Sequence, residues 1–132
     1  IMAFSSINNY ISFEIIILYI SAIFWTLGYD TIYGVQDVAD DEIIGIKSTA
    51  IKFKRNIKLF VGLCYLITFL LLILLFGKDI GFNFESIILI MFFLSLVFQI
   101  KIFKQNSPLD CLRAFKLNNF SGLLMFLAIL LK

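Results

Sequence analysis

The sequence predicts an all-α membrane protein, a multi-pass bundle of about four transmembrane helices, and three observations carry this prediction. Of the 132 residues, 61% are hydrophobic and only 15% are charged, whereas soluble domains carry roughly 25% charged residues. Apolar stretches recur along the chain with the length, roughly 20 residues, that crosses the hydrocarbon core of a bilayer. Nine of the eleven basic residues, all except Lys78 and Lys132, fall in two polar segments, 30–58 and 101–116. We therefore expect the lipid bilayer to surround this chain.

The four spans are expected at about 10–33, 57–76, 82–101 and 108–131. The segment 34–56, between the first two spans, is expected to be a polar loop. The last span is free of charged residues only from Leu117 to Leu131, and this segment alone is too short to cross a bilayer. However, Ser107 followed by Pro108 is typical of a helix start, and a helix from there to Leu131 is about 36 Å long.

The basic residues also predict the orientation of the chain. Cytoplasmic loops of membrane proteins carry an excess of lysine and arginine. The polar segments 30–58 and 101–116 hold nine of the eleven basic residues, so both are expected in the cytoplasm. The two ends of the chain would then face the opposite side of the membrane.

Several kinds of chemistry are excluded by composition. Histidine is absent, and the two cysteines, Cys64 and Cys111, have no CxxC spacing. Zinc fingers, His-ligated haem or metal centres, and Ser/His or Cys/His dyads therefore cannot form within this chain. Any metal site must use oxygen ligands, and we expect no nucleic-acid partner.

The acidic residues that follow the first span form the candidate site. On one continuous helix, a single face would carry Asp30, Tyr33, Asp37 and Asp41. Like charges one turn apart repel, and carboxylates near a helix C-terminus oppose its dipole, so such a face favours a bound cation. Mg²⁺ suits carboxylate ligands and is commonly shared with phosphate oxygens. Lys47, shortly beyond this face, is placed to contact the same phosphate.

The competing interpretation is that these carboxylates simply face water where a transmembrane helix ends. Asp40 and Glu42 lie off the proposed face and are assigned to solvent. Asp30 directly follows the apolar span, and an ionisable residue at membrane depth is a functional candidate. In the last span, Asn118 and Asn119 are expected to form hydrogen bonds to a neighbouring helix, with a substrate contact as the alternative for Asn119.

The string from Tyr29 to Ala50, YDTIYGVQDVADDEIIGIKSTA, resembles the second aspartate-rich motif of the UbiA-type intramembrane prenyltransferases. The pattern DxxYxxxDxxxD coincides with the four residues of the candidate face. The closing GIKSTA is similar to the branch of the family that acts on 4-hydroxybenzoate. A second string at 111–122, CLRAFKLNNFSG, resembles the segment before the final helix of that branch. The resemblance extends over essentially the whole chain.

The resemblance implies the C-terminal half of a nine-helix bundle in the bacterial inner membrane, with a cavity open to the cytoplasm. Members bind a polyprenyl diphosphate through Mg²⁺ held by two aspartate-rich motifs and transfer the prenyl group to an acceptor. In the suspected branch the acceptor is 4-hydroxybenzoate, in ubiquinone biosynthesis. The implied metal ligands are Asp30, Asp37 and Asp41, the implied diphosphate contacts are Lys47, Tyr33 and Asn119, and the implied catalytic residues are Asp30, Tyr33 and Lys47.

The first motif of the family, NDxxDxxxD, has no counterpart in this sequence. We therefore expect this polypeptide to be inactive alone and to need the missing helices, for example from a separately encoded N-terminal half. A piece of a longer protein, a split-gene product and a decaying remnant are all compatible with the sequence. The alternative functions are a non-catalytic membrane protein that binds divalent cations, or another enzyme of the family, from the haem O or menaquinone pathway.

Overall fold

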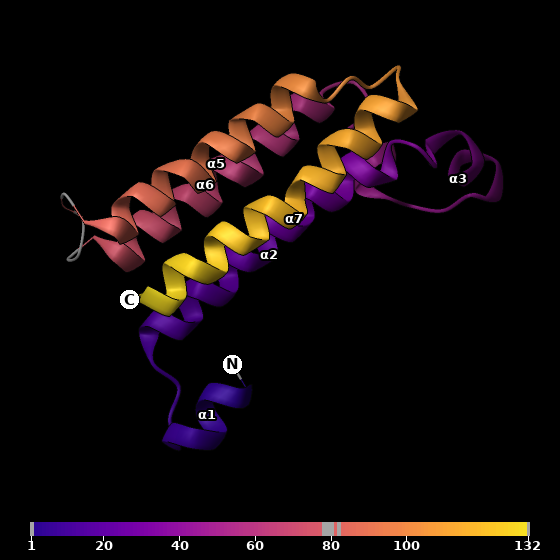
Figure 1. Cartoon of the computed structure of the whole chain (residues 1–132). Helices are drawn as coiled ribbons and strands as arrows, with labels where there is room; N and C mark the ends of the chain where they lie inside the picture. The colour runs from indigo at the N-terminus through magenta and orange to yellow at the C-terminus, as the bar shows by residue number, and fades with distance from the viewer. Residues whose placement is uncertain (1, 78–80, 82, 132) are drawn as a thin grey trace.

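A computed structural model describes residues 2–77, 81 and 83–131. Residue 82, the expected start of the third span, lies outside this part of the chain. The regular structure of the described residues is entirely helical, which confirms the predicted all-α class. The helices are α1 (Met2–Asn8), α2 (Phe13–Gly34), α3 (Val38–Ile44), α4 (Thr49–Lys52), α5 (Ile57–Phe76), α6 (Phe84–Ile102) and α7 (Pro108–Leu131), shown in Figure 1.

The four long helices, α2, α5, α6 and α7, form an antiparallel bundle (Figure 1). Helix α2 packs mainly against α5 and also along α7, while α6 packs mainly against α7. Each of the four is long and apolar enough to cross a membrane, as the sequence predicts. The short helix α1 lies beyond the N-terminal end of α2.

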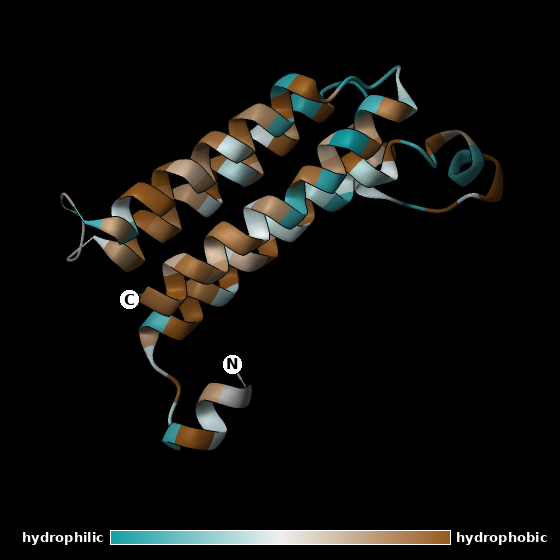
Figure 2. Ribbon diagram, viewed as in Figure 1, coloured by the Kyte–Doolittle hydropathy of each residue, from teal (hydrophilic) through white to brown (hydrophobic). Residues whose placement is uncertain are grey.

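The two polar segments meet at one end of the bundle, where α3 projects away from the long helices (Figure 1). There the side-chain amide of Gln105 donates a hydrogen bond to the backbone carbonyl of Lys54, at 2.8 Å. Figure 2 shows hydrophilic residues gathered at this end and hydrophobic residues along most of the long helices. We call it the loop end of the bundle; its location in the cytoplasm stays a prediction.

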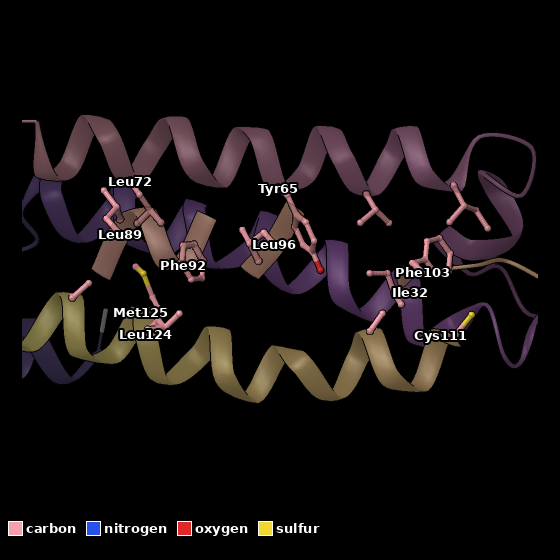
Figure 3. Close-up of a cluster of buried hydrophobic side chains, with 14 of the residues drawn as sticks. Ile32, Tyr65, Leu72, Leu89, Phe92, Leu96, Phe103, Cys111, Leu124 and Met125 are labelled. Carbon is pink, nitrogen blue, oxygen red and sulfur yellow. The ribbon is translucent and has the colours of Figure 1, made fainter. Parts of the chain in front are cut away.

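The core lies between the four long helices (Figure 3). Its largest fully buried side chains include Ile32, Tyr65, Leu72, Phe92, Leu96 and Phe103. Many large apolar side chains also cover the outer surface; Leu70, for example, is 55% exposed and Phe126 is 61% exposed. Soluble proteins rarely expose apolar surface on this scale, so the outside of the bundle suits contact with lipid or with further helices.

A glycine allows α2 and α5 to approach closely. Gly28 of α2 lies against the ring of Tyr65 of α5. A Cβ atom at residue 28 would lie 2.8 Å from Cδ1 of that ring and closer still to Cε1. Small residues at helix contacts permit such close packing within membranes.

The same tyrosine begins a buried chain of hydrogen bonds that links three helices. The Tyr65 hydroxyl donates to Oε1 of Gln99 on α6, at 2.7 Å, and Nε2 of Gln99 donates to the Ser121 hydroxyl on α7, at 2.8 Å. The hydroxyls of Ser95 and Ser121 lie 2.7 Å apart. Interhelical hydrogen bonds of this kind contribute about 0.6–2 kcal/mol each in membranes, and these fix how α5, α6 and α7 are aligned.

Replacing Gly28 by alanine is expected to separate α2 from α5 and lower the free energy of unfolding by about 1–3 kcal/mol, the usual cost of overpacking. Gly62→Ala on α5 is the matched control, because a Cβ atom there would meet nothing within 4 Å. The measurement is the unfolding of both variants in mixed detergent micelles of rising dodecyl sulfate content. Equal stability of the two variants would show that the close contact at Gly28 does not exist.

Candidate functional site

Helix α2 ends at Gly34, near the expected end of the first span at residue 33. The expectation that Asp30, Tyr33, Asp37 and Asp41 share one face of a single helix is therefore wrong. Here backbone hydrogen bonds join residues three apart in place of the four of an α-helix. The Gln36 N–H donates to the Tyr33 carbonyl at 3.1 Å, and the Asp37 N–H donates to the Gly34 carbonyl at 3.2 Å. A new helix, α3, then begins with Asp37 as its N-cap residue. Glycine has a low helix propensity, which favours a break at Gly34. Asp37 does not cap α3 with a side-chain hydrogen bond.

The break changes the electrostatics of the acidic motif. Asp37, Asp40 and Asp41 lie at the N-terminus of α3, where the helix dipole stabilises negative charge. These carboxylates therefore need no cation to offset an unfavourable dipole. Of the three predicted metal ligands, Asp30, one turn before the end of α2, is the one whose charge the helix dipole opposes. The carboxylate oxygens suit a metal ion by their chemistry, whereas the helix dipole gives Asp37 and Asp41 no need of one.

Two side-chain contacts hold the acidic segment against the loop end. The buried Thr31 hydroxyl donates to the Leu27 carbonyl at 2.6 Å and lies 2.8 Å from the Thr49 hydroxyl. Because a hydroxyl has one proton to donate, Thr49 is the donor of this second bond, which joins α4 to α2. Farther out, the Lys54 ammonium forms an ion pair with the Glu42 carboxylate at 2.8 Å. Glu42 is thus partly exposed to solvent but also has a structural partner.

Several residues of the GIKSTA string shape the backbone. Gly45 adopts a φ of +82°, a left-handed conformation that glycine tolerates best. Its N–H donates to the Asp41 carbonyl at 2.9 Å, which ends α3. Ser48 caps α4 by accepting a hydrogen bond from the Ile51 N–H at 3.3 Å. Lys47 is left as the exposed, charged member of the string.

The three predicted metal ligands lie at the surface of this chain. Asp30 and Asp37 are exposed and Asp41 is half-buried. Among the described residues, no group of three or more acidic or cysteine side chains is arranged to hold a metal ion. The donor set still fits Mg²⁺, since this ion usually takes only one or two protein carboxylates together with phosphate oxygens.

The remaining predicted residues lie at different depths along the bundle. The ring of Tyr33 packs against Phe115 of α7, with centroids 4.9 Å apart, and Tyr33 remains 42% exposed. Asn119 is exposed and lies one turn farther along α7. Because α7 runs antiparallel to α2, Asn119 is about level with Tyr29, deeper in the bundle than Tyr33. Asp30 and Tyr33 share the end of α2, whereas Asp37, Asp41 and Lys47 lie beyond it.

Sequence reasoning missed the residues that support the site. The Thr31–Thr49 hydroxyl pair has no signature in the spacing of either residue. Gln99 had a clear signal, because it is the one side-chain amide in an otherwise apolar span, and buried polar side chains join helices in membranes.

With this geometry established, comparison with known proteins matches residues 1–130 to the UbiA prenyltransferase family. The chain belongs to this family. It is 37% identical over 134 residues to a 4-hydroxybenzoate octaprenyltransferase of Edwardsiella ictaluri, covering 98% of this chain and 45% of the relative. It is also 38% identical over 130 residues to the protein of the same name from Francisella tularensis subsp. mediasiatica, covering 96% of this chain and 44% of the relative.

These matches confirm the family that the motif at 29–50 indicates. The chain spans about 45% of the length of the curated relatives that it matches. No solved structure matches it. Membership of the family together with four apolar helices identifies a multi-pass integral membrane protein.

Replacing Thr49 by valine removes the hydroxyl donor to Thr31 while preserving side-chain shape. We expect amide hydrogen exchange in residues 35–48 to become about two- to tenfold faster, as loss of one hydrogen bond predicts, with exchange in α5–α7 unchanged. Thr26→Val is the control, because Thr26 is an exposed threonine of α2. If both variants exchange alike, the hydroxyl pair does not hold the acidic segment.

Proposed function

We propose that this chain supplies the second aspartate-rich motif, and part of the prenyl-binding surface, of a Mg²⁺-dependent enzyme that transfers a polyprenyl group to 4-hydroxybenzoate in ubiquinone biosynthesis. The observation that carries the proposal is an exposed apolar stripe on α2 that ends in acidic residues. Relatives named 4-hydroxybenzoate octaprenyltransferase support the choice of donor and acceptor over the haem O and menaquinone alternatives.

The stripe consists of exposed positions three and four residues apart, which share one side of a helix. These positions are Ile16, Ile20, Ile23, Thr26 and Asp30. From the first to the last they extend about 21 Å along the axis. A polyprenyl diphosphate has the same order of properties, a long apolar chain with a charged group at one end. We infer that the prenyl chain lies along this stripe with its diphosphate at the acidic end.

The acidic segment provides the groups that would receive the diphosphate. Asp37 and Asp41 are the ligands that would hold Mg²⁺, which supplies Lewis-acid stabilisation of the leaving group. Lys47 offers an exposed ammonium to the same phosphate oxygens. Asp30 and Tyr33, where the stripe meets the motif, orient the diphosphate or stabilise the developing allylic cation.

The reaction replaces one ring proton of the acceptor by the prenyl group. The bond from the allylic carbon to the diphosphate oxygen breaks, with the electron pair remaining on oxygen. The ring carbon ortho to the hydroxyl of 4-hydroxybenzoate forms the new bond to the allylic carbon and then loses its proton to the released diphosphate. We assign Asn119, on α7, a side-chain amide contact to the diphosphate. The proposed setting is the bacterial inner membrane, with the loop end in the cytoplasm.

A role in cation transport is less well supported. A transport pathway needs ligands along its length. The acidic residues within the spans other than Asp30 and Asp110 are Glu14 and Glu85, and both begin their helices at the end of the bundle opposite the loop end. A line of ligands across the membrane is therefore not evident in the described residues.

The purified 132-residue chain, supplied with polyprenyl diphosphate, 4-hydroxybenzoate and Mg²⁺ in vesicles, is expected to form no prenylated product. Its exposed carboxylates leave an allylic cation open to water, which active sites must exclude. A chimera that fuses the unmatched N-terminal half of the Edwardsiella relative to this chain is expected to restore prenyl transfer. Turnover by the chain alone, or an intact and folded chimera without activity, would refute the proposal.

Within that chimera, Asp37→Asn and Asp41→Asn are each expected to lower kcat by about 10²–10³-fold, the usual effect of removing one electrostatic stabiliser of a leaving group. Asp40→Asn is the matched control, because Asp40 is exposed in the first turn of the same helix. Product formation is measured at saturating Mg²⁺ and diphosphate. Equal losses in all three variants would assign the effect to α3 as a whole and not to two metal ligands.

A further inference from the structure

A groove of about 520 Å³ lies between α6 and α7, away from the acidic motif. Its volume is within the range of small-molecule sites. None of its lining residues belongs to the segment 29–56. The apolar part of its lining is Met91, Leu94, Val97 and Phe98 from α6 with Leu117 and Phe120 from α7.

The groove opens to the outside of the bundle. Leu94 is 57% exposed, Phe98 is 53% exposed and Phe120 is 48% exposed, although all three are large and apolar. They lie on helices that cross the membrane. The hydroxyl of Ser95, also in the lining, is already bonded to the Phe92 carbonyl and to Ser121. The groove wall therefore presents hydrocarbon to the bilayer.

One cation lies at the loop end of the groove. Lys101 is part of the lining and occupies the last turn of α6. Its side chain is exposed, and the structure records no ion pair for it within the described residues. The nearby Lys104 is different, because it lies 3.7 Å from the Asp110 carboxylate. Lys101 thus keeps its charge available to an anionic ligand.

The length of the groove matches one leaflet of a bilayer. Met91 and Lys101 are ten residues apart on α6, which is about 15 Å along the helix axis. The hydrocarbon core is about 30 Å thick, so the apolar wall extends from the interface to about the midplane. A lipid tail whose headgroup lies beside Lys101 would follow this wall.

We propose that the groove between α6 and α7 binds one acyl chain of an anionic phospholipid, whose phosphate pairs with Lys101. Basic sites between transmembrane helices on the cytoplasmic side commonly hold anionic headgroups. A phosphodiester carries a single negative charge, which one lysine balances. An isoprenoid diphosphate fits less well, because it carries more negative charge and the groove lining contains no carboxylate that could share a metal ion with it.

The test places a fluorescent reporter in the groove of the full chain. Trp25 is the one tryptophan, so Trp25→Phe, Phe98→Trp gives a single indole in the groove. The protein is reconstituted in phosphatidylcholine vesicles containing a small, equal fraction of brominated phosphatidylglycerol or brominated phosphatidylcholine, which quench indole fluorescence on contact. We expect the anionic lipid to occupy the groove about fivefold more favourably, the effect of one lysine near an anionic headgroup.

Adding Lys101→Gln is expected to remove this preference. There are two matched controls. Lys58→Gln, which removes an exposed lysine at the loop end of α5, should leave the preference for the anionic lipid unchanged. A Leu63→Trp reporter on the exposed side of α5, outside the groove, should show no preference between the two lipids. Equal quenching by the two lipids at Phe98→Trp would leave only nonspecific lipid contact and overturn the proposal. If neither brominated lipid quenches the indole, protein covers the groove. If farnesyl diphosphate displaces the brominated lipid, the groove is a substrate site. Either result also overturns the proposal.

Discussion

The hydroxyls of Thr31 and Thr49 lie 2.8 Å apart at the end of α2, and this contact determines where the acidic segment goes. It holds α4 across the end of α2, so the chain between them must leave the helix, form α3 and return. The left-handed turn at Gly45 allows that return. The Glu42–Lys54 ion pair adds a second connection on the exposed side, where such pairs are worth little individually. The position of Asp37 and Asp41 is therefore a consequence of tertiary contacts that involve neither carboxylate.

Helix α2 has to satisfy two sets of constraints at once. One side packs into the bundle, with Gly28 against Tyr65 and with Ile32 fully buried. The other side leaves isoleucines exposed and ends at Asp30. The first side holds the helix rigidly against α5, and rigid elements position functional groups more accurately than loops do. The second side is then free to bind an apolar ligand with a charged end.

The sequence predicts the fold class and the four spans well. Bilayer thickness sets the length of a transmembrane helix, and apolar stretches of that length are easily recognised between the polar segments of this chain. The sequence also indicates the family, through the resemblance of the strings at 29–50 and 111–122 to segments of known members. It fails at Gly34, since helical spacing continues through this residue while the backbone does not. Gly34 lowers the helix propensity at this point, and the contact between Thr31 and Thr49 holds the later segment against the end of α2. Spacing within one segment contains no information about that second contact. The side-chain amide of Gln99 is visible in the sequence of its span, but its partners on α5 and α7 cannot be predicted from spacing within α6.

The central claim is that the acidic segment holds a metal ion in contact with the diphosphate of the donor. Mn²⁺ can replace Mg²⁺ as a paramagnetic probe, and its resonance lines broaden when a bound phosphate oxygen is ¹⁷O. With the chimera and farnesyl diphosphate labelled at its phosphate oxygens, we expect broadened lines that disappear in the Asp37→Asn, Asp41→Asn double variant. Lines of equal width with labelled and unlabelled diphosphate, or broadening that survives in the double variant, would contradict the claim.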